Sequence, residues 1–148
     1  MRVTDLIQSY LKDSRFREFY TKWTDGKAGE SIHLIGLKGS LTSIIAACTY
    51  QKSNKSLIIV RSDKEEAAYF YNDLQKLLSK EDVYFFPDSY RRPYSDQEQV
   101  NNINIGLRAE ALERLLIAEK PCIIITYPEA LAEKVITKQS LKSKTLNI

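Results

Sequence analysis

Four short apolar runs constrain the fold of this chain most, because each is too short for a buried helix and is rich in β-branched or aromatic side chains. They are Ile32–Ile35, Leu57–Val60, Val83–Phe86 and Cys122–Ile125. Near-continuous apolar strands of this kind are typical of a parallel sheet that is covered on both faces. Helical segments separate the runs, so we predict an α/β domain with a parallel, doubly wound sheet and right-handed crossovers.

The segments between the runs carry helical periodicity and helix-start signals. We predict helices over residues 40–52, from Ser62 onward, over about 98–118 and from Thr126 onward. Residues 62–65 and 126–129 each fit a capping box, in which a hydroxyl caps the helix and an acid follows three residues later. The third helix is expected to bury one apolar stripe, made of Val100, Ile103, Leu107, Ala111 and Leu115.

A helical prefix precedes the first apolar run. Val3–Leu11 has helical spacing with Thr4 as its predicted N-cap. A second short helix follows and carries four aromatic side chains, those of Phe16, Phe19, Tyr20 and Trp23. Trp23 is large enough that we expect it to form part of the core or its cover.

These segments divide the chain into three parts. Residues 1–30 are the helical prefix, residues 31–137 the α/β lobe, and residues 138–148 a polar connection. The connection ends on Leu146–Ile148, which is expected to begin another strand. We therefore expect the sequence to be the first part of a longer protein.

Composition narrows the class of protein without indicating a function. The chain has 148 residues, of which 43% are hydrophobic and 28% charged, the size and balance of one soluble domain. Its formal charge of +3 is too small to indicate a nucleic-acid partner by itself. The first residues contain no apolar block of the signal-peptide type, and no run is long enough to span a bilayer, so we expect a cytoplasmic protein without a membrane partner.

The two cysteines and the histidine are expected to be structural. Cys48 and Cys122 lie inside apolar runs without metal-ligand spacing, which indicates buried thiols rather than a disulfide or a metal site. His33 lies within the first apolar run, with no cysteine or carboxylate at catalytic spacing, so we expect it to be packed or sheet-facing. We predict no catalytic residue and no metal ligand in this chain.

The residues after the first apolar run resemble a phosphate loop that has lost its key side chains. A working loop reads G-x-x-x-x-G-K-[ST] and lies between a strand and a helix. Its second glycine lets backbone N–H groups surround the phosphates. Its lysine reaches the phosphates, and its Ser or Thr hydroxyl holds magnesium. Gly36 matches the first glycine and Ser43 the hydroxyl, whereas Leu41 replaces the second glycine and Thr42 the lysine. Two interpretations stay open: a degenerate nucleotide loop, or an ordinary strand-to-helix turn that uses Gly36 and Gly39 for backbone geometry.

Under either interpretation we expect no cofactor in this chain. The loop positions concerned are Gly36, Gly39, Ser40, Leu41, Thr42 and Ser43. Lys38 lies on the wrong side of the loop to replace the missing lysine, and we expect it to be solvent-exposed. No acid directly ends an apolar run to hold magnesium, since Asp63 is better explained as a helix cap and Asp88 as a turn residue. The helix N-terminus retains only a weak attraction for an anion such as sulfate.

Four segments, in order along the chain, resemble one protein family. They are residues 34–40 (LIGLKGS), 83–94 (VYFFPDSYRRPY), 108–115 (RAEALERL) and 123–136 (IIITYPEALAEKVI). They resemble, in that order, the L-x-G-L-x-G-S, V-x-x-F-P-x-(W/S)-x-x-x-P-Y, R-x-x-x-L-x-x-L and I-V-x-T-x-x-A-L-x-x-(R/K)-V-x segments near the start of bacterial transcription-repair coupling factors. The second is also similar to the FPDYYDYY region of the excision-repair subunit UvrB. No single segment is diagnostic, and the resemblance rests on all four together.

This resemblance implies a non-catalytic, UvrB-like lobe of RecA-like fold. In that family the N-terminal region is built like UvrB, with a RecA-like lobe (domain 1a), an insert that docks UvrA, and no working ATP site. Separate motor domains use ATP and magnesium to translocate on DNA and remove stalled RNA polymerase. Residues 31–137 would be the first part of that lobe, a scaffold for nucleotide excision repair that contacts the motor region. The missing Gly-Lys pair and the absence of a long aromatic hairpin after the FPD segment both favour the coupling factor over UvrB.

Two other functions stay open. One is a catalytic RecA-like lobe of a helicase or UvrB-like ATPase, and the other is a free-standing, flavodoxin-like domain that binds a small molecule at its strand ends. A possible nucleic-acid or partner contact mixes cations with aromatic rings, at Tyr90, Arg91, Arg92 and Tyr94. We favour a surface loop with charged tips for that segment.

Overall fold

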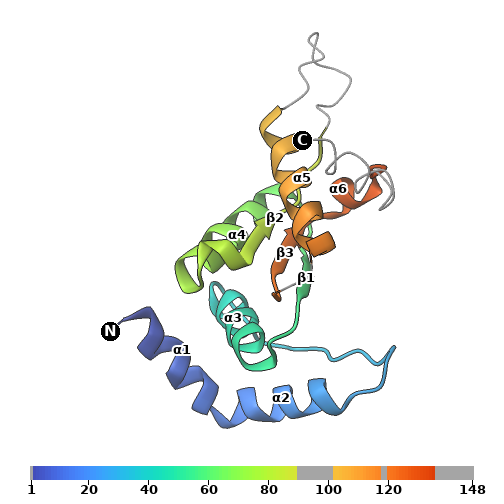
Figure 1. Cartoon of the computed structure of the whole chain (residues 1–148). Helices are drawn as coiled ribbons and strands as arrows, with labels where there is room; N and C mark the ends of the chain where they lie inside the picture. Colours follow the sequence, from blue (N-terminus) through green and yellow to red (C-terminus); the bar gives the residue numbers. More distant parts are fainter. Residues whose placement is uncertain (1, 90–101, 118–119, 136–148) are drawn as a thin grey trace.

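Two helices begin the chain, and after them helices and short parallel strands alternate (Figure 1). The computed structural model describes residues 2–89, 102–117 and 120–135. Within these residues the elements are α1 (Val3–Lys12), α2 (Ser14–Asp25), α3 (Leu41–Ser53), β1 (Leu57–Val60), α4 (Lys64–Leu77), a 3₁₀ turn (Lys80–Asp82), β2 (Val83–Phe85), α5 (Asn102–Ile117), β3 (Ile123–Thr126) and α6 (Pro128–Ala132).

The sheet is parallel, with β3 between β1 and β2. Leu57 and Val83 both align with Ile123 at the start of β3. The mixed α/β class and the parallel pairing predicted from the apolar runs are therefore confirmed. The chain passes from β1 across the position of β3 to β2 and then steps back to β3. The two crossovers therefore run in opposite directions. Right-handed connections of this kind place their helices, α4 and α5, on opposite faces of the sheet.

The ring contacts agree with this arrangement of helices on both faces. Phe85 lies against Tyr71 of α4, with ring centroids 5.3 Å apart. Its neighbour Phe86 lies under the guanidinium of Arg108 of α5, which is 4.1 Å from the ring centroid. Because consecutive strand residues point to opposite faces, α4 and α5 cover opposite sides of the sheet.

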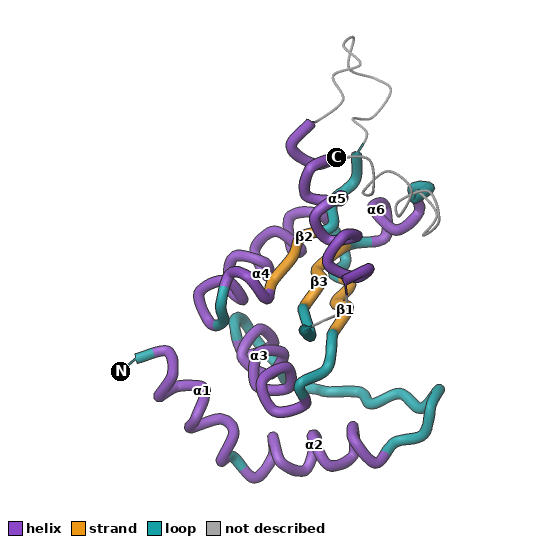
Figure 2. The backbone as a smooth tube through the Cα atoms, viewed as in Figure 1, coloured by secondary structure: helices purple, strands orange, loops and turns teal. Residues whose placement is uncertain are grey.

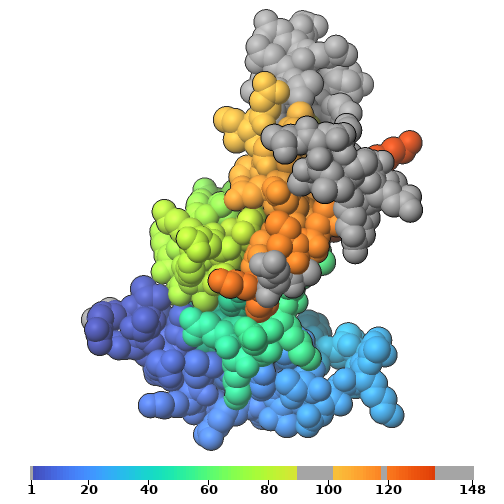
Figure 3. Space-filling model, viewed as in Figure 1, coloured from blue at the N-terminus to red at the C-terminus, as the bar shows by residue number. Residues whose placement is uncertain are grey.

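The main core lies on the α4 side of the sheet. There α3 and α4 pack together, and α1 contacts both of them. Fully buried side chains fill this layer: Ile7, Ala47, Cys48, Ala67, Leu74, Ile123 and Ile125. In the space-filling view the blue surface of α1 and α2 adjoins the teal surface of α3 (Figure 3).

The first predicted strand does not form. Residues 26–40 make a long connection between α2 and α3 (Figure 2), and Ile32–Ile35 is not a strand. A four-residue apolar run becomes a strand only where neighbouring strands accept its hydrogen bonds, because β-propensity depends on context. Here Ile35 is 85% exposed. His33 is also exposed, so the expectation that it would be packed is wrong.

Three predicted helix starts are shifted. Helix α1 begins after Arg2 rather than Thr4. Helix α4 begins after Asp63, whose carboxylate accepts a hydrogen bond from the Glu66 N–H, rather than after Ser62. Helix α6 begins after Tyr127, with Pro128 at its first position, because the Thr126 hydroxyl instead donates to the Phe86 carbonyl. At α4 the longer side chain of Asp63 thus replaces the predicted Ser62 hydroxyl as the cap. Before α6 the buried Phe86 carbonyl takes the Thr126 hydroxyl.

The aromatic side chains of α2 form a cover over α3. Phe16 is buried, and the rings of Phe16, Tyr20 and Trp23 follow one another at about 6 Å, with centroid separations of 6.0 and 5.9 Å. The Lys52 ammonium group of α3 lies 4.3 Å from the Tyr20 ring centroid. The structural role expected for Trp23 is consistent with this packing. None of the helices described here is long and apolar enough to cross a membrane.

Candidate functional site

The segment that resembles a phosphate loop is an irregular connection in which two glycines have a left-handed backbone conformation. Gly36 has φ +84° and Gly39 has φ +55°, and a Cβ added at either would meet no atom within 4 Å. Backbone conformation alone therefore explains both glycines. Since no strand precedes this loop, it is neither a strand-to-helix turn nor a phosphate loop anchored to a sheet. Lys38 is exposed, as expected.

The hydroxyl at the magnesium position is engaged elsewhere. Ser43 is buried inside α3, and its hydroxyl donates to the Asp73 carboxylate of α4 at 3.3 Å. Leu41 is the first residue of α3. Thr42 follows it and carries no positive charge at the position where a phosphate loop has its lysine. Ser40 caps the helix by position but accepts no side-chain hydrogen bond there. A nucleotide with magnesium does not fit this set of groups, because the charge, the glycine nest and the free hydroxyl are all missing.

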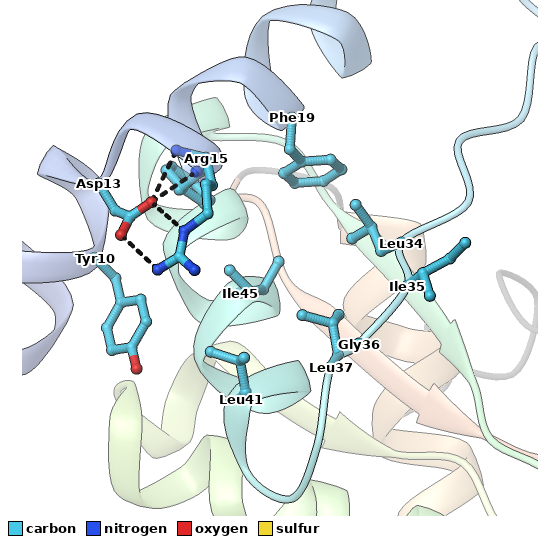
Figure 4. Close-up of a pocket in the computed structure, with 11 residues that line it drawn as sticks. Tyr10, Asp13, Arg15, Phe19, Leu34, Ile35, Gly36, Leu37, Leu41 and Ile45 are labelled. Atoms are coloured by element: carbon cyan, nitrogen blue, oxygen red, sulfur yellow. Dashed lines mark hydrogen bonds and ion pairs between the residues drawn. The ribbon is translucent and has the colours of Figure 1, made fainter.

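An apolar pocket of about 270 Å³ lies beside this loop (Figure 4). The loop contributes Leu34, Ile35 and Leu37 to its lining, and α3 contributes Leu41 and Ile45. Aromatic side chains from the helical prefix complete the wall: Tyr10, Phe16 and Phe19. The prefix helices thus present hydrocarbon to one side of the loop, which is the opposite of what a phosphate group requires.

The charged groups of this pocket neutralise each other. The Arg15 guanidinium donates to both carboxylate oxygens of Asp13, at 3.2 and 3.1 Å. Asp13 also caps α2 by accepting from the Arg15 and Phe16 N–H groups. These hydrogen bonds, chiefly the one from the Arg15 side chain, lower the pKa of Asp13 from 3.8 to about 2. The pair therefore stabilises the start of α2 and leaves little net charge for a ligand.

A second polar cluster lies where the strands end, the usual place for ligands in open α/β sheets. Tyr127, just after β3, donates its hydroxyl hydrogen to the Asp88 carboxylate and accepts the Asp88 N–H at 2.9 Å. Lys64, at the start of α4, donates to the same carboxylate at 3.3 Å. Burial, followed by the hydrogen bond to Asp88, raises the pKa of Tyr127 well above its ordinary value. Tyr127 is therefore a neutral donor that ties β2 to β3.

Arg108 forms the buried centre of this cluster. Its Nη1 donates to the Pro87 carbonyl at 2.6 Å and the Ala130 carbonyl at 3.1 Å, and it lies 3.3 Å from the Glu133 carboxylate. Glu133 in turn accepts from the Ser89 N–H and hydroxyl. Both charged side chains are largely buried, at 8% and 15% exposure. The groups satisfy one another, so this network holds α5 and α6 against the end of β2 and offers no reactive side chain.

Sequence reasoning missed this network and identified the buried face of α5 only in part. Ala111 is buried as predicted and Arg108 is buried with it, whereas Ile103 is 75% exposed and Leu115 is also exposed. Val100 of the predicted stripe lies outside the described residues. The predicted stripe counted only apolar residues. An ion pair between Arg108 and Glu133, just beyond α6, would have indicated the buried face of the helix. A single sequence does not show which of several acids pairs with Arg108.

The remaining predicted positions are placed as follows. Cys48 and Cys122 are buried free thiols, as predicted, and burial raises the pKa of Cys48 to about 11. Tyr90, Arg91, Arg92 and Tyr94 lie outside the described residues. In the part of the chain that the structure describes, no three His, Cys, Asp or Glu side chains come together as a metal site.

Comparison with known proteins gives one informative similarity. The transcription-repair-coupling factor of Rickettsia bellii (strain RML369-C) is 30% identical to this chain over 88 residues. The chain is similar to part of a transcription-repair-coupling factor. The matched region covers 60% of this chain and 8% of the relative, so the chain spans only a small part of that protein's length. No protein-family model and no solved structure matches the chain.

Proposed function

We propose that this chain is a non-catalytic, UvrB-like lobe of a transcription-repair coupling factor. The observation that carries the proposal is the 30% identity over 88 residues to such a factor. The parallel sheet with helices on both faces supports a RecA-like lobe over residues 31–137, with residues 1–30 as a helical prefix. Residues 138–148 would lead toward the UvrA-docking insert.

The lobe would act through its shape and its partners rather than by hydrolysing ATP. Leu41 and Thr42 supply neither the glycine nor the lysine of a phosphate loop, and the Ser43 hydroxyl is bonded to Asp73. ATP and magnesium would bind to motor domains elsewhere in the parent protein, which would contact DNA and RNA polymerase. The present chain would support UvrA recruitment by the insert and contact the motor region, in the cytoplasm.

A strand-specific repair assay tests this function. The codons for residues 31–137 would be deleted in frame from the gene of the source organism, and removal of ultraviolet lesions would be followed on each DNA strand. We expect the transcribed strand to lose its faster repair, while the purified variant protein retains ATPase activity. Faster repair of the transcribed strand in the deletion variant would contradict the proposal, and retained ATPase activity shows that the rest of the protein is folded.

The alternative is a catalytic lobe of a helicase or UvrB-like ATPase. It requires nucleotide binding by this chain, which the proposal excludes. Magnesium–ATP titration separates the two functions directly, whatever the outcome of the repair assay.

A further inference from the structure

The prefix helices α1 and α2 are attached to the rest of the fold mainly by apolar contacts. Their buried side chains are Ile7 and Phe16, each 2% exposed, and α1 contacts both α3 and α4. Among the residues that the structure describes, one hydrogen bond joins α1 or α2 to the later elements, from the Cys48 thiol, a weak donor, to the Ile7 carbonyl at 3.8 Å. No ion pair of the described residues joins them. The charged contacts are lysine ammonium groups over aromatic rings, as for Lys52 over Tyr20 at 4.3 Å.

The connection from α2 to α3, residues 26–40, adds no anchor by hydrogen bonding. Its hydrogen bonds in the described structure stay local, between Lys27 and Glu30 and at the junctions with α2 and α3. Leu34 and Leu37 add apolar contacts to the wall of the pocket beside the loop, whereas Ile35 is 85% exposed. Movement of α2 therefore breaks no hydrogen bond between this connection and the sheet.

Helix α3, in contrast, is tied to the sheet and to α4 by polar bonds. The Tyr50 hydroxyl donates to the Pro121 carbonyl, just before β3, at 2.7 Å. The Ser43 hydroxyl donates to the Asp73 carboxylate of α4 at 3.3 Å. Neither bond involves the prefix helices, so α3 keeps both of them when α1 and α2 leave.

We propose that α1 and α2 undock together from α3 and α4 while the sheet and its helices stay folded. Proteins open locally where buried apolar contacts are few and hydrogen bonds do not hold the segment to its neighbours. Asp13 makes the two helices one unit, because its N–H donates to the Tyr10 carbonyl at the end of α1 and its carboxylate accepts the Arg15 N–H at the start of α2. Undocking exposes the Cys48 thiol, which the carbonyl of α1 otherwise contacts. This inference does not rest on the proposed function.

Alkylation of Cys48 in the full 148-residue chain measures the undocking. Iodoacetamide is added at increasing urea concentrations below the unfolding transition, and digestion with mass spectrometry follows Cys48 separately from Cys122. We expect the opening that exposes Cys48 to have a lower free energy than global unfolding measured by circular dichroism. It should also depend less on urea, because undocking exposes less surface than unfolding. Equal free energies with equal urea dependence would overturn the proposal.

A matched pair of variants tests whether the prefix itself gates Cys48. Ile7→Val and Ile124→Val each remove one buried methylene, the first from α1 and the second from the α5 side of β3. Both should lower global stability slightly. Only Ile7→Val should speed the alkylation of Cys48, by about two- to tenfold, because Ile124 keeps its contacts in the undocked state. Equal acceleration by both variants, or none by Ile7→Val, is the result that rules out undocking of the prefix.

Amide hydrogen exchange tests whether α1 and α2 move as one unit. The slowest amides of both helices should share the opening free energy found for Cys48, whereas those of β3 should exchange only through global unfolding. Different opening free energies for α1 and α2, or a common value for α1, α2 and β3, would refute the undocking of a single two-helix unit.

Discussion

At the scale of single residues, the buried Arg108 donates hydrogen bonds to two backbone carbonyls on different segments of the chain. The replacement Arg108→Leu removes the donor to the Pro87 and Ala130 carbonyls and breaks the buried ion pair with Glu133. Removing one partner of a buried pair typically costs about 3–5 kcal/mol. We therefore expect the free energy of unfolding, measured by urea denaturation, to fall by about that amount.

The exposed Arg17 of α2 provides the control for this measurement. The replacement Arg17→Leu should change the free energy of unfolding by no more than about 0.5 kcal/mol, as is usual for surface positions. Equal effects at Arg108 and Arg17 would show that the buried network contributes little to stability.

Asp13 makes a pH-dependent contribution. Its pKa is lowered from 3.8 to about 2 in the folded chain, so it stabilises the fold at pH values above 3.8, and this contribution is lost as the pH falls toward 2. The replacement Asp13→Ala should lower Tm at pH 7, and its difference from wild type should shrink between pH 4 and pH 2. Asp13→Asn retains a capping oxygen without the charge, so at pH 7 its Tm should lie between those of wild type and Asp13→Ala. Its Tm should also depend less on pH over this range than that of the wild type. A difference between wild type and Asp13→Ala that does not change with pH would contradict the role assigned to the carboxylate.

Individual residue roles were predictable where local chemistry decides them. The buried thiols of Cys48 and Cys122 follow from neighbouring residues alone, and so does the capping role of Asp63, although the capping-box pattern favoured Ser62. The Ser43–Asp73 and Arg108–Glu133 contacts join residues 30 and 25 positions apart on different elements. Such contacts depend on how the elements pack, which periodicity within one segment does not specify.

At the scale of elements, two glycines should respond in opposite ways to the same substitution. Gly39 has a left-handed backbone, so Gly39→Ala should lower the free energy of unfolding by about 1 kcal/mol. Gly106 lies inside α5 with open space around its Cβ position, so Gly106→Ala should raise it by about 0.5–1 kcal/mol. Urea denaturation of both variants measures these changes. A stabilising Gly39→Ala would show that the connection before α3 does not hold the described conformation.

The strands were predictable to different degrees. Leu57–Val60 and the runs near Val83 and Ile123 form strands because they pair with one another in register. Ile32–Ile35 has a similar composition but no partner, and its neighbour Leu37 and part of the run line a pocket against the prefix helices. Composition identifies segments that can form strands, whereas pairing depends on the whole fold.

At the scale of the whole molecule, the apolar runs predicted the parallel α/β sheet but not how completely it is covered. β3 is buried on both faces, while the exposed Ile58 and Val60 leave one side of β1 open. Similarity to a transcription-repair-coupling factor extends over 60% of the chain and 8% of that relative.

Affinity for DNA is a second property of the whole chain. Arg91 and Arg92 stand in a segment rich in aromatic residues, yet the net charge of +3 gives little general attraction for phosphate. We expect the variant R91A/R92A to bind labelled DNA as the wild type does in fluorescence anisotropy. A clear, salt-dependent loss of affinity would instead assign a phosphate contact to these two arginines.

The central claim is that this lobe acts without binding a nucleotide. Isothermal titration of magnesium–ATP into the full chain tests it most directly, because Leu41 and Thr42 supply neither the glycine nor the lysine of a phosphate loop and the Ser43 hydroxyl is bonded to Asp73. We predict no saturable heat up to about 1 mM ATP, which corresponds to a binding free energy weaker than about −4 kcal/mol. Saturable binding with a Kd of about 1 μM would contradict the claim and favour a catalytic lobe.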